Sequence, residues 1–104
     1  MAKVYFTITG TKYYYGKEFI EPGAKVSLRK EPDNEYDKEA IAVLIEGIGV
    51  IGYVANSSFT VLGDSMSAGR LYDKIGKTAV GKVIHVLPQG VLCKLSKKSF
   101  VKKE

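Results

Sequence analysis

Three acidic residues alternate with other residues in one short segment: Asp33, Glu35 and Asp37. Carboxylates at this spacing could bind a metal ion or act as acid and base in catalysis. Their spacing suggests a calcium-binding loop, but an EF-hand needs glycine at its sixth position and glutamate at its twelfth. Counted from Asp33, those positions hold Lys38 and Leu44, which excludes an EF-hand. Carboxylates acting as a general acid and base need burial to raise one pKa. A turn-forming segment offers little burial, so we predict no catalysis here, and loose binding of a hard cation stays an open alternative.

Tyrosines form a second group in segments that read as connections. Three are consecutive, Tyr13-Tyr14-Tyr15, between Lys12 and Lys17, and Tyr36 lies among the acids. Exposed rings can stack on nucleic-acid bases, which is worth ~1–3 kcal/mol per base. The alternative is that these rings only cover the ends of the fold. The residues alone leave both interpretations open.

The chain has one histidine, His85, and one cysteine, Cys93. An internal disulfide, a cysteine zinc cage and a multi-histidine metal site are therefore excluded. His85 stands inside the apolar run Val83–Leu87, and Cys93 lies in an apolar strand where it reads as a small core residue. We expect no metal site and no cofactor, and we do not expect an enzyme.

The charge is unevenly distributed along the 104 residues, which carry 16 Lys and Arg against 11 Asp and Glu, for a net charge of +5. Residues 70–103 hold nine basic residues and one acid, whereas residues 31–46 hold six acids and one base. A basic face suits a polyanion, although it also serves solubility. No basic amphipathic helix, membrane-length apolar run or signal segment is evident, so we expect a cytoplasmic protein that does not bind membranes.

The surrounding elements read mainly as strands. Val4, Phe6 and Ile8 alternate with polar residues, which is the period of a half-buried strand. Glycine and proline turns bound several similar segments, and residues 19–20 suggest a short edge segment. The six strands expected span residues 4–9, 25–29, 40–46, 50–54, 79–87 and 91–95.

Two brief helices interrupt this pattern. Asn56-Ser57-Ser58 resembles a helix N-cap, and Phe59, Leu62 and Met66 are spaced for one helical face. A further helical turn is expected within residues 69–76. Six short strands with one or two short helices predict a mainly β fold, a small antiparallel barrel.

Three segments together resemble the HIRAN domain family. The first is residues 29–43, with arginine, an acid, proline, a turn, Tyr36-Asp37 and then Ala40-Ile41. The second is residues 10–16, in which a glycine, a basic residue and a tyrosine pair precede another glycine. The third is residues 50–54, which contain a Gly-Tyr pair. The resemblance covers residues 4–96 and implies a six-stranded OB-like β-barrel, with one HIRAN-like domain at residues 1–97 and a basic tail at 98–104.

The resemblance also implies a function. In a eukaryotic fork-remodelling helicase, this domain captures the 3′-hydroxyl end of single-stranded DNA. Transferred to this chain, Asp37 would accept a hydrogen bond from that hydroxyl, the tyrosines would stack on or flank the terminal bases, Asn34 would contact a base edge or the backbone, and Lys12 would meet a phosphate. The residues so implied to bind nucleic acid are Lys12, Tyr13, Tyr14, Asn34, Tyr36, Asp37 and Tyr53.

We therefore expect a noncatalytic module that binds single-stranded DNA with a preference for a free 3′-hydroxyl end, acting in DNA repair or replication processing. A carboxylate accepts from a hydroxyl but repels a terminal phosphate, which supports the assignment of Asp37. The alternatives are an adaptor that docks on a nuclease or helicase with little DNA affinity, and a small metal-dependent enzyme using the acids at 31–39.

Overall fold

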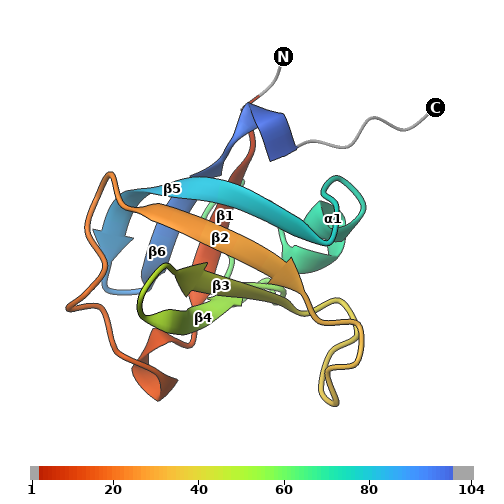
Figure 1. Cartoon of the computed structure of the whole chain (residues 1–104), viewed down its shortest axis with the longest axis horizontal. Coiled ribbons are helices and arrows are strands. Elements are labelled where there is room, and N and C mark those ends of the chain that lie inside the picture. Colours follow the sequence, from red (N-terminus) through yellow and green to blue (C-terminus); the bar gives the residue numbers. More distant parts are fainter. Residues whose placement is uncertain (1–2, 100–104) are drawn as a thin grey trace.

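The computed structural model describes residues 3–99 as a closed six-stranded barrel in which all neighbouring strands are antiparallel. The strands follow the order β1-β4-β3-β2-β5-β6 around the barrel (Figure 1). Their bounds are β1 Tyr5–Thr9, β2 Lys25–Lys30, β3 Ile41–Ile45, β4 Gly49–Val54, β5 Thr78–Leu87 and β6 Gly90–Leu95. One α-helix, α1 (Ala68–Tyr72), and two 3-10 turns, η1 (Thr11–Tyr13) and η2 (Lys97–Ser99), are the other elements within these described residues. The predicted mainly β barrel is confirmed.

Alternating apolar residues build the interior of the barrel. Phe6 and Ile8 of β1 are fully buried, as are Val26 and Leu28 of β2. Their neighbours at odd positions in β2 are exposed, as the two-residue period of a strand requires. Closure gives each of the six strands in residues 3–99 a hydrogen-bonded neighbour on both sides, which protects their edges from pairing with other chains.

Gly52 lets two strands approach closely on the side of the barrel where η1 lies. A Cβ at this position would stand 2.7 Å from the Thr9 carbonyl oxygen and 2.7 Å from Cγ2 of Ile8. Only glycine fits that space without displacement of backbone. The close approach brings the end of β1, and η1 after it, against β4.

The prediction of a helix around residues 56–66 is wrong. The segment forms turns, in which the Ser57 side chain accepts a hydrogen bond from the Phe59 amide at 3.1 Å. Gly63 has a left-handed φ of 53°, which ends any helix there. Phe59 is 97% exposed, so it does not contribute to a buried helical face. The Ser57 carbonyl accepts from the Val61 amide at 3.0 Å, so a single turn forms, and the left-handed Gly63 ends it before Met66.

The second predicted helical turn is present, one residue earlier, as α1. The Ser67 side chain accepts a hydrogen bond from the Arg70 amide at 3.4 Å and caps the N-terminus of this helix. Leu71, within the helix, is fully buried. Residues 19–20 form a turn rather than an edge strand, because the Ile20 amide bonds the Lys17 carbonyl at 3.0 Å.

At the C-terminal end, Ser99 ties η2 to β5, since its Oγ accepts from the Val80 amide at 2.9 Å. Of the predicted tail, residues 100–104 lie outside the described residues. Within residues 3–99, no helix has the length and apolar character needed to cross a membrane.

Candidate nucleic-acid interface

A half-buried carboxylate organises the surface at the end of β2. Oε1 of Glu31 accepts hydrogen bonds from Tyr53 Oη at 2.8 Å and from Asn34 Nδ2 at 3.1 Å, and its Oε2 faces the Arg29 guanidinium at 3.4 Å. Tyr53 comes from β4, whereas Asn34 comes from the loop that follows β2. Glu31 therefore ties that loop to the barrel wall.

The pKa values of this pair follow from its geometry. Partial burial alone would raise the pKa of Glu31, but hydrogen bonds from Tyr53, Asn34 and Arg29 and the charge of Arg29 outweigh it and hold the pKa below its usual range. Partial burial and the charged acceptor Glu31 together raise the pKa of Tyr53 well above its ordinary value. Glu31 is thus ionised and Tyr53 neutral at physiological pH, which are the protonation states that the 2.8 Å bond needs.

Asn34 shapes the loop that carries the predicted site. Its Oδ1 accepts from the amides of Tyr36 at 2.9 Å and Asp37 at 3.1 Å, and its Nδ2 donates to Glu31. This is an Asx-type turn, in which a side chain replaces a backbone partner. One Nδ2 hydrogen is left for a ligand, so most of the hydrogen-bonding capacity of Asn34 serves to position its two neighbours.

Asp37 is held by contacts on both of its carboxylate oxygens. Oδ1 accepts from the Glu39 amide at 2.9 Å, and Oδ2 accepts from Asn56 Nδ2 at 2.9 Å. The Asn56 side chain is itself fixed, because its Oδ1 accepts from the Gly69 amide at 2.8 Å. Each carboxylate oxygen has a second lone pair, so Asp37 retains capacity to accept a hydrogen bond from an incoming hydroxyl.

Exposed rings lie on both sides of this network. The Tyr14 ring centroid is 6.1 Å from that of Tyr53, with the planes tilted by 44°. Tyr36 is 92% exposed and Tyr13 is 76% exposed. A chain of contacts therefore runs from Tyr14 through Tyr53 and Glu31 to the loop bearing Tyr36. In Figure 1 the turn η1 and the loop after β2 both extend on the β4 side of the barrel, away from β5.

Lys12 lines a groove of about 420 Å³ beside these rings. Its Nζ lies 5.2 Å from the centroid of the Tyr13 ring. Lys17 also lines this groove and donates to the carbonyls of Leu87 at 2.6 Å and Pro88 at 2.8 Å, which fastens the η1 connection to the β5–β6 turn. The structure thus brings an aromatic and a cationic group together at this end of the surface.

The seven predicted residues fall into two connected groups. Lys12, Tyr13 and Tyr14 lie in or beside η1, and Asn34, Tyr36 and Asp37 lie in the loop after β2, with Tyr53 between the groups. Sequence reasoning missed Glu31 and Asn56, which hold this arrangement together, and no local pattern signals either contact. It also missed the exposure of Phe59. Residues 3–99 contain no group of three or more His, Cys, Asp or Glu side chains placed to hold a metal ion.

Comparison with known proteins decides the family. The family model described as "HIRAN domain" matches residues 1–76, which is most of the chain. The chain belongs to the HIRAN domain family. HIRAN domains are known as DNA-binding modules and are generally noncatalytic. The resemblance in the three segments is thereby confirmed. No curated protein matches the sequence significantly.

Two solved structures share the fold of this HIRAN domain. The HIRAN domain of human HLTF superposes with a TM-score of 0.59 at 19% identity, covering 90% of this chain and 74% of that one. A protein from Lactobacillus plantarum superposes with a TM-score of 0.56 at 24% identity, covering 91% of this chain and 97% of that one. At these identities the likeness supports the OB-like barrel and not the details of a site.

Proposed function

We propose that this HIRAN domain is a noncatalytic module that binds single-stranded DNA and prefers a free 3′-hydroxyl end. The observation that carries the proposal is the fixed Asp37 carboxylate, which retains acceptor capacity and directly follows Tyr36, a residue whose ring is almost fully exposed. A terminal base stacking on that ring would place its sugar hydroxyl near a carboxylate. A terminal phosphate at the same point would be repelled by the like charge.

The remaining parts of the surface fit the same ligand. The rings of Tyr13 and Tyr14 offer further stacking positions, and Lys12 offers a cation for the backbone. The ring of Tyr53 contacts the ring of Tyr14, and the hydroxyl of Tyr53 donates to Glu31. Action in DNA repair or replication processing, beside a helicase or nuclease, is the role that such end binding would serve.

The test is fluorescence anisotropy with a 5′-labelled single strand of about ten nucleotides that ends in either a 3′-hydroxyl or a 3′-phosphate. The hydroxyl strand is expected to bind more tightly. Asp37→Asn removes the charge but keeps an acceptor, so it should abolish the difference between the two strands. Glu35→Gln is the matched control, because it removes one charge two positions away and should preserve the difference.

Tyr36→Ala tests the stacking. It should weaken binding of the hydroxyl strand about 5- to 150-fold, which corresponds to ~1–3 kcal/mol for one stacked base. Phe19→Ala is the control, since Phe19 is also more than half exposed but belongs to the connection between η1 and β2 and not to the loop after β2. Equal affinity for both strands in the wild-type protein would overturn the end preference. An absence of binding at moderate salt would favour the adaptor alternative.

A further inference from the structure

Three lysines stand side by side on the outside of the barrel. Lys25 of β2 is paired directly with Lys82 of β5, which is paired directly with Lys94 of β6. Residues directly opposite in antiparallel strands share a face, with Cβ atoms about 4.5–5.5 Å apart, and like charges so placed destabilise the sheet. None of the three forms an ion pair with any residue of the described range 3–99. The fold therefore tolerates a repulsion that a polar residue at any of these positions would relieve.

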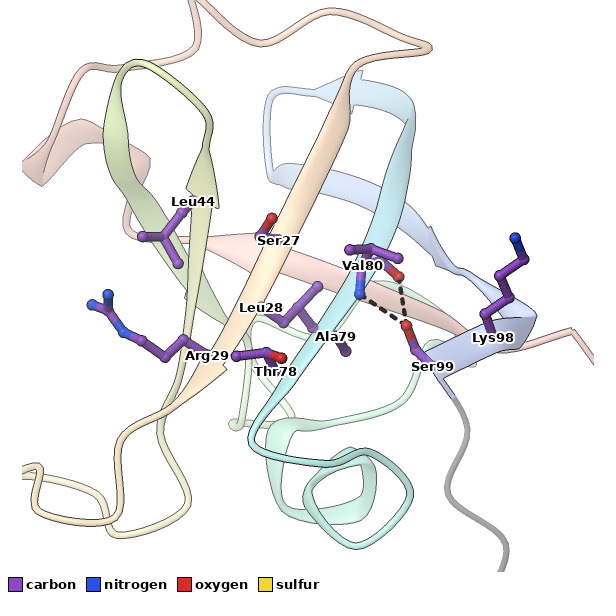
Figure 2. Close-up of a pocket in the computed structure, with 9 residues that line it drawn as sticks. All are labelled: Ser27, Leu28, Arg29, Leu44, Thr78, Ala79, Val80, Lys98 and Ser99. Atoms are coloured by element: carbon purple, nitrogen blue, oxygen red, sulfur yellow. Dashed lines mark hydrogen bonds between the residues drawn. The ribbon is translucent and has the colours of Figure 1, made fainter.

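The turn η2 adds two more cations to this face. Lys97 lines a groove of about 560 Å³ together with the three paired lysines. Lys98 and Arg29 line the adjoining groove, of about 610 Å³, shown in Figure 2. The two grooves share Val80, and Figure 2 shows the bonds from Ser99 to Val80 that fix η2 at this point. We call this surface the lysine face, formed by Lys25, Lys82, Lys94, Lys97 and Lys98; Arg29, at its border, is paired with Glu31 and is not counted in it.

The lysine face is separate from the interface around Asp37. In the strand order of the barrel, β5 is three strands from β4 in either direction. Tyr53 of β4 and Lys82 of β5 therefore belong to opposite walls, and Figure 1 shows these two strands on opposite sides of the barrel. A ligand on the lysine face leaves the other interface open.

The chemistry of the lysine face favours paired over unpaired nucleic acid. Single-stranded sites combine cations with aromatic rings on which bases stack. No aromatic side chain among residues 3–99 lines either groove of this face. A lysine contacts a phosphate as a point charge. A duplex presents its phosphates, while the faces of its bases are stacked on one another and need no aromatic partner. We propose that the lysine face binds the phosphate backbone of duplex nucleic acid, independently of sequence and of the proposed end binding.

The probe is a DNA dumbbell, a duplex of about 20 base pairs closed by a hairpin at each end and ligated so that no free end exists, with the fluorophore attached to a base of one hairpin loop. Its affinity is measured by anisotropy across a series of salt concentrations. The Lys82→Gln/Lys94→Gln variant should weaken binding and reduce the log–log salt slope by about 1.8, which is the loss of two phosphate contacts. The Lys82→Arg/Lys94→Arg variant keeps both charges and should bind with the wild-type affinity and salt slope.

The matched control is Lys74→Gln/Lys77→Gln, which removes the same net charge from exposed lysines that line neither groove. It should leave the slope within about 0.5 of the wild-type value. An equal loss in this control would overturn the proposal, because binding would then depend only on net charge. No wild-type binding to the dumbbell at low salt would also overturn it, as would equally tight, lysine-dependent binding of a closed single-stranded circle. Preferential binding to phosphatidylglycerol vesicles through the same lysines would assign the face to membranes instead.

Discussion

Removal of a single hydroxyl group tests whether Glu31 organises the loop after β2. The substitution is Tyr53→Phe, which deletes the 2.8 Å hydrogen bond to Oε1 of Glu31 and leaves the ring beside Tyr14. Glu31 keeps its contacts with Asn34 at 3.1 Å and Arg29 at 3.4 Å. The change therefore isolates one bond of the network.

The expected cost follows from the charge and the exposure of Glu31. A hydrogen bond to an ionised group is worth about 1.5–3 kcal/mol net. The Glu31 side chain is 23% exposed, so water replaces part of the lost bond. We expect the free energy of unfolding to fall by about 1–2 kcal/mol at pH 7, which lowers Tm by several degrees in a domain of this size.

The loss of unfolding free energy caused by Tyr53→Phe should depend on pH at both ends of the pH scale. The folded pKa of Glu31 is lowered, so its contribution is present above its unfolded pKa of about 4.3 and is lost as pH falls through the folded value. The folded pKa of Tyr53 is raised, so its contribution is present below about pH 10 and is lost as pH rises through the folded value. The difference between the wild-type protein and Tyr53→Phe should therefore be largest between about pH 4 and 10.

Urea unfolding followed by circular dichroism at pH 3, 5, 7 and 9 measures this difference. Tyr72→Phe is the matched control, because Tyr72 also packs partly against the core and its hydroxyl bonds no residue within the described chain. It should change stability by less than about 0.5 kcal/mol. A Tyr53→Phe cost that is the same at pH 3 and pH 7 would refute the reasoning, since it could not come from an ionised acceptor.

Three further predictions concern the barrel itself. Gly52→Ala should destabilise the fold by about 1–3 kcal/mol in urea titration, because the new methyl group meets the Thr9 carbonyl at 2.7 Å; an unchanged midpoint would contradict the close strand approach. Burial raises the pKa of the Cys93 thiol to about 12, so Ellman's reagent at pH 8 should label it only at the rate of unfolding; immediate labelling would show that the thiol is accessible. Lys82→Gln should raise the free energy of unfolding by about 0.2–1 kcal/mol, since it relieves repulsion from both cross-strand neighbours; a loss of stability would mean that its aliphatic stem matters more than its charge.

Local patterns allowed most of the fold to be predicted. All six strands were expected within one residue of their observed bounds, because alternating apolar residues and glycine or proline turns act over a few neighbouring positions. The prediction of a helix after β4 was wrong, also for a local reason. The helical spacing of Phe59, Leu62 and Met66 is interrupted at Gly63, whose left-handed φ ends the single turn that begins at Ser57.

The interface was predictable only in part. The resemblance to HIRAN domains named the loop residues Tyr36 and Asp37, but it did not reveal what fixes them. Asp37 meets Asn56, 19 residues away, and Glu31 meets Tyr53, 22 residues away. Each bond joins residues from different elements, and the helix and strand periods act only within one element, so no pattern in the chain signals these bonds.

The sequence by itself determined that this chain forms a small β-barrel, since hydrophobic periodicity and turn residues encode strands locally. The tertiary structure decided which side chains become neighbours. Strand register alone places Lys25, Lys82 and Lys94 in one row, although they are far apart in the chain. Register is set by how all six strands close around a shared core, and a shift of one residue would turn each lysine to the opposite face. The net charge of this protein could therefore be read from its sequence, whereas the positions of the charged side chains on the surface of the barrel could not.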